Sequence, residues 1–112
     1  MLRDDSVYLQ HILDAIARIE GYLHQIDEDQ FYATPLRQDG VIRQIEIIGE
    51  ATKHLSLSLT KHNPHVPWSD LSRMCDKLIH QYFGVDVTTV WLTATEDLPL
   101  LRHDIEIIIA SL

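Results

Sequence analysis

The chain has 112 residues, close to the commonest domain size, and 46% of them are hydrophobic, so we expect one folded domain over residues 1–112 rather than disorder. Acidic residues outnumber basic ones by 17 to 9, a formal net charge of −8. That excess argues against a broad basic surface for nucleic acid and, on charge alone, favours a basic protein partner. A single cysteine excludes an internal disulfide, and the sequence shows neither a signal peptide nor an apolar span of about 20 residues. We therefore expect a cytoplasmic protein that does not enter a membrane.

The first predicted helix runs from about Asp5 to Asp27, and acidic residues with Ser6 supply an N-cap at its start. Its apolar residues recur at steps of three and four, which places them on one helical face. They are Tyr8, Ile12, Ile16, Ile19, Leu23 and Ile26. A short extra helix is expected around Phe31-Tyr32-Ala33.

The second long helix is predicted to begin at Thr34-Pro35, because threonine is a good N-cap and proline suits the first helical position. Its apolar face comprises Val41, Ile45, Ile48, Leu55 and Leu59. The prolines of Asn63-Pro64-His65-Val66-Pro67 must end this helix, since neither can continue it.

The third helix is predicted from Trp68 to about Gly84, with an apolar face of Trp68, Leu71, Cys75, Leu78 and Tyr82. The fourth begins after Asp86, a suitable N-cap, and continues to the C-terminus with a kink near Pro99. No strand-like alternation interrupts this pattern. The predicted fold is therefore all-α: an antiparallel bundle of four long helices plus a short extra helix.

One candidate metal site lies on the second long helix. Glu46, Glu50 and His54 are spaced by four residues and share a helical face. Known di-metal bundles use Glu-x-x-His pairs on two helices, and the chain has no second copy. A solvated polar face is the better interpretation, so we expect no metal and no cofactor.

A second candidate site lies on the third helix. At about 100° per residue, Arg73, Asp76, Lys77 and His80 fall together on the face opposite the apolar one. Two cations, a carboxylate and an imidazole thus share one surface. On spacing alone, a solvated face containing an Asp–Lys pair remains the commoner explanation.

The chain resembles the HepT-like toxins, part of the HEPN group of small helical ribonucleases, along essentially its whole length. The segments that carry the resemblance are Arg3-Asp4, Tyr8-Leu9, Ile47-Ile48-Gly49-Glu50-Ala51, Pro64 with Val66-Pro67-Trp68, Leu78-Ile79-His80-Gln81-Tyr82-Phe83-Gly84-Val85-Asp86, Val90-Trp91 and Leu98-Pro99-Leu100-Leu101. Each is weak alone, but their order and spacing together are specific.

The motif of that family is arginine, usually a polar Asn, Asp or His, three residues, histidine, any residue and tyrosine. Asp76, His80 and Tyr82 match it, but Cys75 stands where the family has arginine. A looser form of the pattern allows up to six residues between arginine and histidine, and Arg73 satisfies it. The sequence leaves open whether Arg73 takes the missing arginine's place.

The resemblance implies a metal-independent endoribonuclease that acts as a homodimer, with the motifs of two chains meeting in a cleft. It also implies a toxin of a toxin–antitoxin pair, whose partner, a small nucleotidyltransferase, silences it by adding AMP to Tyr82. On this reading His80, Asp76 and Arg73 are the catalytic candidates, with RNA as substrate. A homologue impaired by Cys75, acting only as a dimeric binding partner or AMP acceptor, is the alternative.

Overall fold

The computed structural model describes residues 4–80 and 86–112. Seven α-helices and one π-helix make up the four long rods and two short segments of this part. They are α1 (Asp5–Tyr22), α2 (Glu28–Tyr32), α3 (Pro35–Lys53), α4 (Leu57–His62), α5 (Trp68–His80), α6 (Val87–Leu92), the π-helix η1 (Thr93–Asp97) and α7 (Leu98–Ala110).

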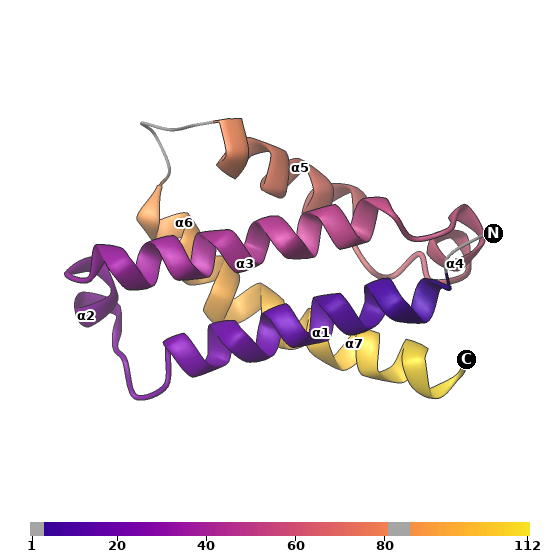
Figure 1. Cartoon of the computed structure of the whole chain (residues 1–112), viewed down its shortest axis with the longest axis horizontal. Coiled ribbons are helices and arrows are strands. Elements are labelled where there is room, and N and C mark those ends of the chain that lie inside the picture. The colour runs from indigo at the N-terminus through magenta and orange to yellow at the C-terminus, as the bar shows by residue number, and fades with distance from the viewer. Residues whose placement is uncertain (1–3, 81–85) are drawn as a thin grey trace.

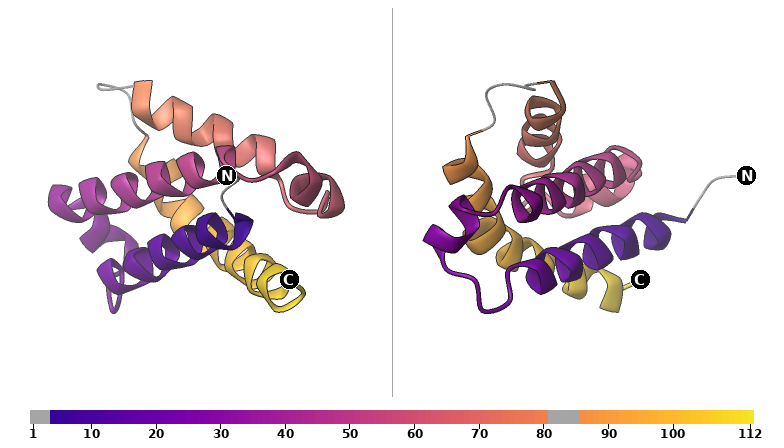
Figure 2. Two further views of the ribbon diagram at one scale, coloured as in Figure 1. Left: turned by 45° about the vertical axis from the view of Figure 1, so that its right-hand side comes forward. Right: turned by 60° about the vertical axis from the view of Figure 1, so that its left-hand side comes forward.

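The long helices pack around α3, with α1 along one side and α5 along another (Figure 1). α1 and α3 run antiparallel, and α7 lies against α1 with its C-terminal end near the start of α1 (Figures 1 and 2). The all-α bundle predicted from apolar spacing is therefore confirmed.

The first helix is shorter than predicted. It starts as expected, where the backbone N–H of Ser6 donates to Oδ1 of Asp4 (3.0 Å). It ends at Tyr22 rather than Asp27, and Gln25 follows with a left-handed backbone (φ 57°) that no α-helix can contain. Asp27 instead caps the short helix α2 through a capping box with Gln30.

The second long helix was also predicted too long, as a single element extending past Leu59. It ends at Lys53, and Ser56 starts a separate helix, α4, by accepting a hydrogen bond from the N–H of Leu59 (3.2 Å). Ser56 is fixed in turn by Asp5, whose carboxylate accepts from its backbone N–H (2.8 Å) and its hydroxyl (2.6 Å). A contact between segments 51 residues apart thus breaks the helix while Leu59 stays buried.

The predicted irregularity near Pro99 is present as the π-helix η1, directly before α7. Proline has no N–H to donate, and its ring collides with the carbonyl four residues earlier in a regular helix. Widening the preceding turn into a π-helix relieves that collision. At the other end of this rod, Asp86 caps α6 as expected, accepting from the N–H of Thr88 (2.9 Å).

The core is mainly aliphatic and is built largely from α1, α3 and α7, with further side chains from α2 and α6. Its most enclosed side chains are at most 1% exposed. They include Leu9, Ile12, Ile16, Ile19, Phe31, Val41, Ile45, Ile48, Val90, Leu98 and Ile105. In the described part of the chain, no helix combines the length and apolar character needed to cross a membrane.

Candidate functional site

The contact between α3 and α5 is centred on Gly49 and Cys75. Cys75 has no exposed surface, and a Cβ atom built on Gly49 would lie 2.1 Å from Cβ of Cys75 and 2.3 Å from its Sγ. Real carbon atoms never approach so closely, so only glycine fits at position 49 while a side chain occupies position 75. The two helices therefore meet almost backbone to backbone at Cys75, the position where the resemblance led us to expect the arginine of the motif.

The thiol of Cys75 is an uncharged group in this environment. Its Sγ donates a hydrogen bond to the backbone carbonyl of Glu46 (3.2 Å). Burial raises its pKa to about 11, because the thiolate would lose its hydration inside the helix contact. At neutral pH position 75 thus offers neither a positive charge for a phosphate nor a thiolate nucleophile.

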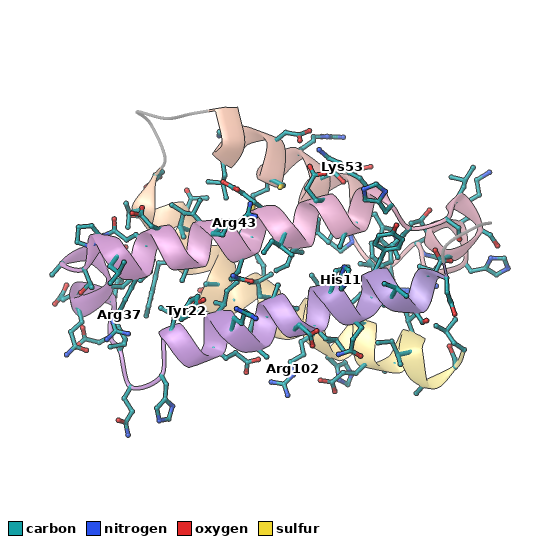
Figure 3. The ribbon with its side chains drawn as sticks, viewed as in Figure 1. His11, Tyr22, Arg37, Arg43, Lys53 and Arg102 are labelled. Atoms are coloured by element: carbon teal, nitrogen blue, oxygen red, sulfur yellow. The ribbon has the colours of Figure 1, made fainter. Side chains whose placement is uncertain are left out.

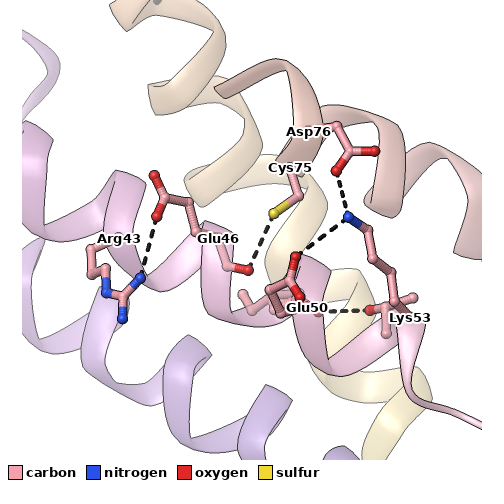
Figure 4. A network of polar contacts seen from close by, with 8 residues as sticks. Arg43, Glu46, Glu50, Lys53, Cys75 and Asp76 are labelled. Carbon is pink, nitrogen blue, oxygen red and sulfur yellow. Dashed lines mark hydrogen bonds and ion pairs between the residues drawn. The ribbon is translucent and has the colours of Figure 1, made fainter. Parts of the chain in front are cut away.

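Charged side chains surround this buried thiol (Figure 4). Nζ of Lys53 lies 2.5 Å from Oδ1 of Asp76 and 3.4 Å from Oε1 of Glu50. On the same face of α3, Arg43 reaches Oε2 of Glu46 at 3.4 Å. The hydrogen bond to Asp76 is the main cause that raises the pKa of the Lys53 amine, so this cation stays charged at neutral pH.

Two of the cations near Cys75, Arg43 and Lys53, belong to α3 (Figure 3). They do not belong to α5, the helix that carries most of the motif and is called the motif helix below. Asp76 was predicted to share a face with Arg73 and Lys77 of its own helix. The structure adds an ion pair that the spacing did not predict, from Asp76 across to Lys53, 23 residues earlier in the chain. Local spacing cannot reveal such a pair, because it depends on how closely Gly49 lets the helices approach.

Arg73 lies on a different side of α5 from Cys75. The two positions are two residues apart, which corresponds to about 200° around a helix. Arg73 and Lys77 are exposed, whereas Cys75 is fully enclosed. His80 is the last residue of α5, one turn beyond Asp76; its side chain and the whole of Tyr82 lie outside the described residues.

The candidate metal trio on α3 is occupied by other contacts. Glu46 pairs with Arg43, Glu50 pairs with Lys53, and the ring of His54 stacks on Tyr8 at 5.1 Å. Within residues 4–80 and 86–112, no three His, Cys, Asp or Glu side chains gather closely enough to hold a metal ion.

Comparison with known proteins identifies one family whose profile covers most of the chain. The profile of the family described as ribonuclease HepT-like matches residues 12–108. A probable ribonuclease HepT of Thermococcus cleftensis is 42% identical over 95% of this chain and 96% of its own length. A putative RNase of Methanocaldococcus jannaschii is 39% identical over 98% and 95% of the two chains.

Another similar protein, from Methanocaldococcus jannaschii, is described as a gamma-glutamylcyclotransferase and putative RNase. It is 43% identical over 94% of this chain, which spans only 47% of that protein's length. No solved structure matches the chain.

These findings define first a class, the small all-helical proteins of the HEPN group. Within that class, the chain belongs to the ribonuclease HepT-like family. The resemblance noted in the sequence is thereby confirmed, and the family supports a ribonuclease function.

Proposed function

We propose that the chain is a metal-independent endoribonuclease that works as a cytoplasmic homodimer, with the α5 helices of two copies meeting in a cleft. The observation that carries this proposal is the family match over residues 12–108, which includes a motif helix ending at His80. In this proposal the protein is the toxin of a toxin–antitoxin pair. A small nucleotidyltransferase is its partner, and AMP on Tyr82 silences it.

Metal-independent cleavage of RNA requires a group that transfers protons, such as histidine, and positive charge near the phosphate. RNA can be cleaved by attack of its own 2′-hydroxyl on the adjacent phosphate, with loss of the 5′-oxygen of the next nucleotide. Histidine can remove the first proton or supply the second, because its ordinary pKa lies near 6.5. Cations stabilise the charge that develops on the phosphate, and Arg73 remains a candidate for that role.

A second candidate function is favoured by Cys75. The buried thiol, hydrogen-bonded to Glu46 and with its pKa raised to about 11, cannot replace a guanidinium. Loss of one such donor costs about 3 kcal/mol of transition-state stabilisation, roughly 100-fold in rate. The alternative is therefore a silent homologue that serves as a dimeric binding partner or accepts AMP without cleaving RNA.

Restoring the arginine separates the two candidates. We would compare cleavage of a labelled RNA by the parent chain, His80→Ala, Cys75→Arg, Cys75→Ser and Cys75→Arg/His80→Ala. An active parent supports the ribonuclease, and activity only in Cys75→Arg that disappears with His80→Ala supports the silent homologue. Cys75→Ser controls for loss of the thiol, and circular dichroism checks that each variant folds. Full activity in a folded His80→Ala variant of an active chain would refute the assignment of His80.

The proposed dimer has its own test. Sedimentation or light scattering at micromolar concentration is expected to give twice the 12.9 kDa chain mass. A clean monomer would contradict a mechanism that needs two motif helices in one cleft.

The proposed modification is tested with a small nucleotidyltransferase encoded beside the gene. The phenol oxygen of Tyr82 would attack the α-phosphate of ATP, lose its proton and release pyrophosphate. The expected result is a mass increase by one or more AMP units, mapped to Tyr82 and absent in Tyr82→Phe. Modification of Tyr8, Tyr22 or Tyr32 instead would overturn this assignment.

A further inference from the structure

We propose that Lys53 is a positioning residue for the motif helix α5: it holds the Asp76 carboxylate against α3 and cancels its charge next to His80, where the proposed function places the RNA. This inference rests on the proposed function, since it concerns the approach of an RNA phosphate. It adds a residue of α3 to a site otherwise built from α5.

Lys53 contacts the motif through its ion pair with Asp76. Its ammonium lies 2.5 Å from Oδ1 of Asp76 and 3.4 Å from Oε1 of Glu50, so two carboxylates of different helices face one cation (Figure 4). Asp76 directly follows the buried Cys75 and precedes His80 by one helical turn. The Lys53–Asp76 pair therefore lies at the start of the motif. A phosphate bound near His80 would be close enough to interact with the charge of the Asp76 carboxylate.

The charge balance explains why the cation matters here. Glu46 is paired with Arg43, whereas Glu50 and Asp76 share only Lys53 among the described ion pairs. Cys75 adds no positive charge, because its thiol is neutral. Without Lys53 the described face would hold two uncompensated carboxylates, and a polyanion approaching it would be repelled.

The direct alternative is that Lys53 itself binds the phosphate. An ammonium has three donors, and two of the described carboxylates already face that of Lys53. Together the three groups carry a net charge of −1, which makes them a poor anion-binding site. Compensation of Asp76 therefore accounts for the arrangement better than phosphate contact does.

The test measures binding of a fluorescein-labelled single-stranded RNA to the full-length chain by fluorescence anisotropy at low and moderate salt. The variants are Lys53→Met, Asp76→Asn and the double variant Lys53→Met/Asp76→Asn. The matched control is Lys61→Met, which removes an exposed lysine of α4 and makes the same change in net charge. Circular dichroism confirms that each variant is folded.

Lys53→Met is expected to weaken RNA binding about three- to fivefold more than Lys61→Met, an effect that fades with salt. The double variant is expected to return to the parent's affinity, because the carboxylate that needed compensation is gone. Equal effects of the two lysine variants would overturn the proposal. A double variant as weak as Lys53→Met would also overturn it, in favour of direct phosphate contact.

A second readout does not depend on RNA. In an NMR titration of the lysine side chains, the pKa of the Lys53 amine is expected above its ordinary value and lower in Asp76→Asn. The same pKa in both chains would show that the pair is absent in solution and would defeat the inference. A third outcome is that the pKa difference is present but neither the parent nor Cys75→Arg binds RNA. That result would count against the proposed function and against the role of Lys53 in RNA binding. Lys53 and Asp76 would then form only a structural ion pair.

Discussion

Two contacts made by the same helix, α3, are built on different principles. Towards α1 the contact is aliphatic, and residues such as Ile16, Ile45 and Ile48 are at most 1% exposed. Towards α5 it depends on Gly49, which lets Cys75 approach, and on the Lys53–Asp76 pair at its edge. The first contact resembles any helical core, whereas the second contains Cys75, at the position where the resemblance led us to expect the motif arginine.

The stability of the two contacts should respond differently to substitution. An aliphatic interface loses stability in proportion to the volume removed, and it tolerates other apolar residues of similar size. At the α3–α5 contact, Gly49 and Cys75 determine the packing, and the charged pair of Lys53 and Asp76 lies directly beside them. A substitution at position 75 therefore changes structure and chemistry together, and experiments must separate the two.

The largest effect on stability is expected from the aliphatic side. Ile45→Ala removes buried methyl groups from a side chain that is 1% exposed, and should lower the free energy of unfolding by about 3–4 kcal/mol. Urea unfolding followed by circular dichroism at fixed protein concentration measures it. Ile107→Ala, at a side chain 54% exposed, is the control and should cost far less; equal losses would contradict the assigned core.

At the α3–α5 contact, the corresponding variant is Gly49→Ala. The added methyl has no room beside Cys75, so we expect a loss of about 2 kcal/mol from forced separation of the helices. The double variant Gly49→Ala/Cys75→Gly should recover part of this loss, because glycine at position 75 of α5 leaves room for the alanine methyl of α3.

The control for Gly49→Ala is Gly21→Ala in α1, where nothing lies within 4 Å of the added Cβ. Its helix propensity should raise stability by about 0.5–1 kcal/mol. If both alanines stabilised the chain, the close approach of α3 and α5 would be disproved.

The third prediction concerns the pH dependence of the α3–α5 contact. The pKa of the Cys75 thiol rises from about 9 when the chain is unfolded to about 11 when it is folded. The folded state then holds the proton more tightly, so this stabilisation is complete below pH 9 and is lost as pH rises towards 11. Two pKa units correspond to at most about 2.7 kcal/mol, so the loss should be about 2 kcal/mol by pH 11.

The measurement is urea unfolding at several pH values between 8 and 11, in parallel with Cys75→Ala, which cannot titrate at this position. Subtracting the two curves removes the contributions of lysine and tyrosine. A difference that stays constant with pH would mean that the thiol titrates normally and is not enclosed by the helices.

The aliphatic contact could be predicted from sequence far better than the polar one. Regular spacing correctly assigned Ile12, Ile16 and Ile45 to the core, because one face of each helix is buried along its length. Boundaries were less predictable: the break after Lys53 depends on Asp5, which binds Ser56 from across the fold.

The candidate site was only partly predictable for the same reason. Spacing correctly placed Cys75 on the buried face of the third helix. It could not show that Asp76 pairs with Lys53, since that contact depends on three-dimensional packing. The roles of Arg73, His80 and Tyr82 stay predictions.

The smallest effect is expected where α1 meets α7 at the surface. Arg102 donates hydrogen bonds to both carboxylate oxygens of Glu20 (2.9 and 2.7 Å) and to Oε1 of Glu106 (2.8 Å). These groups are about half exposed, so water and salt screen the attraction. Arg102→Met should therefore destabilise the chain less than Ile45→Ala or Gly49→Ala does, and the loss should vanish in about 1 M salt. Arg18→Met, which removes an exposed arginine of α1, controls for the change in net charge. A salt-independent loss would show that the aliphatic stem of Arg102, rather than its charge, supports the contact between α1 and α7.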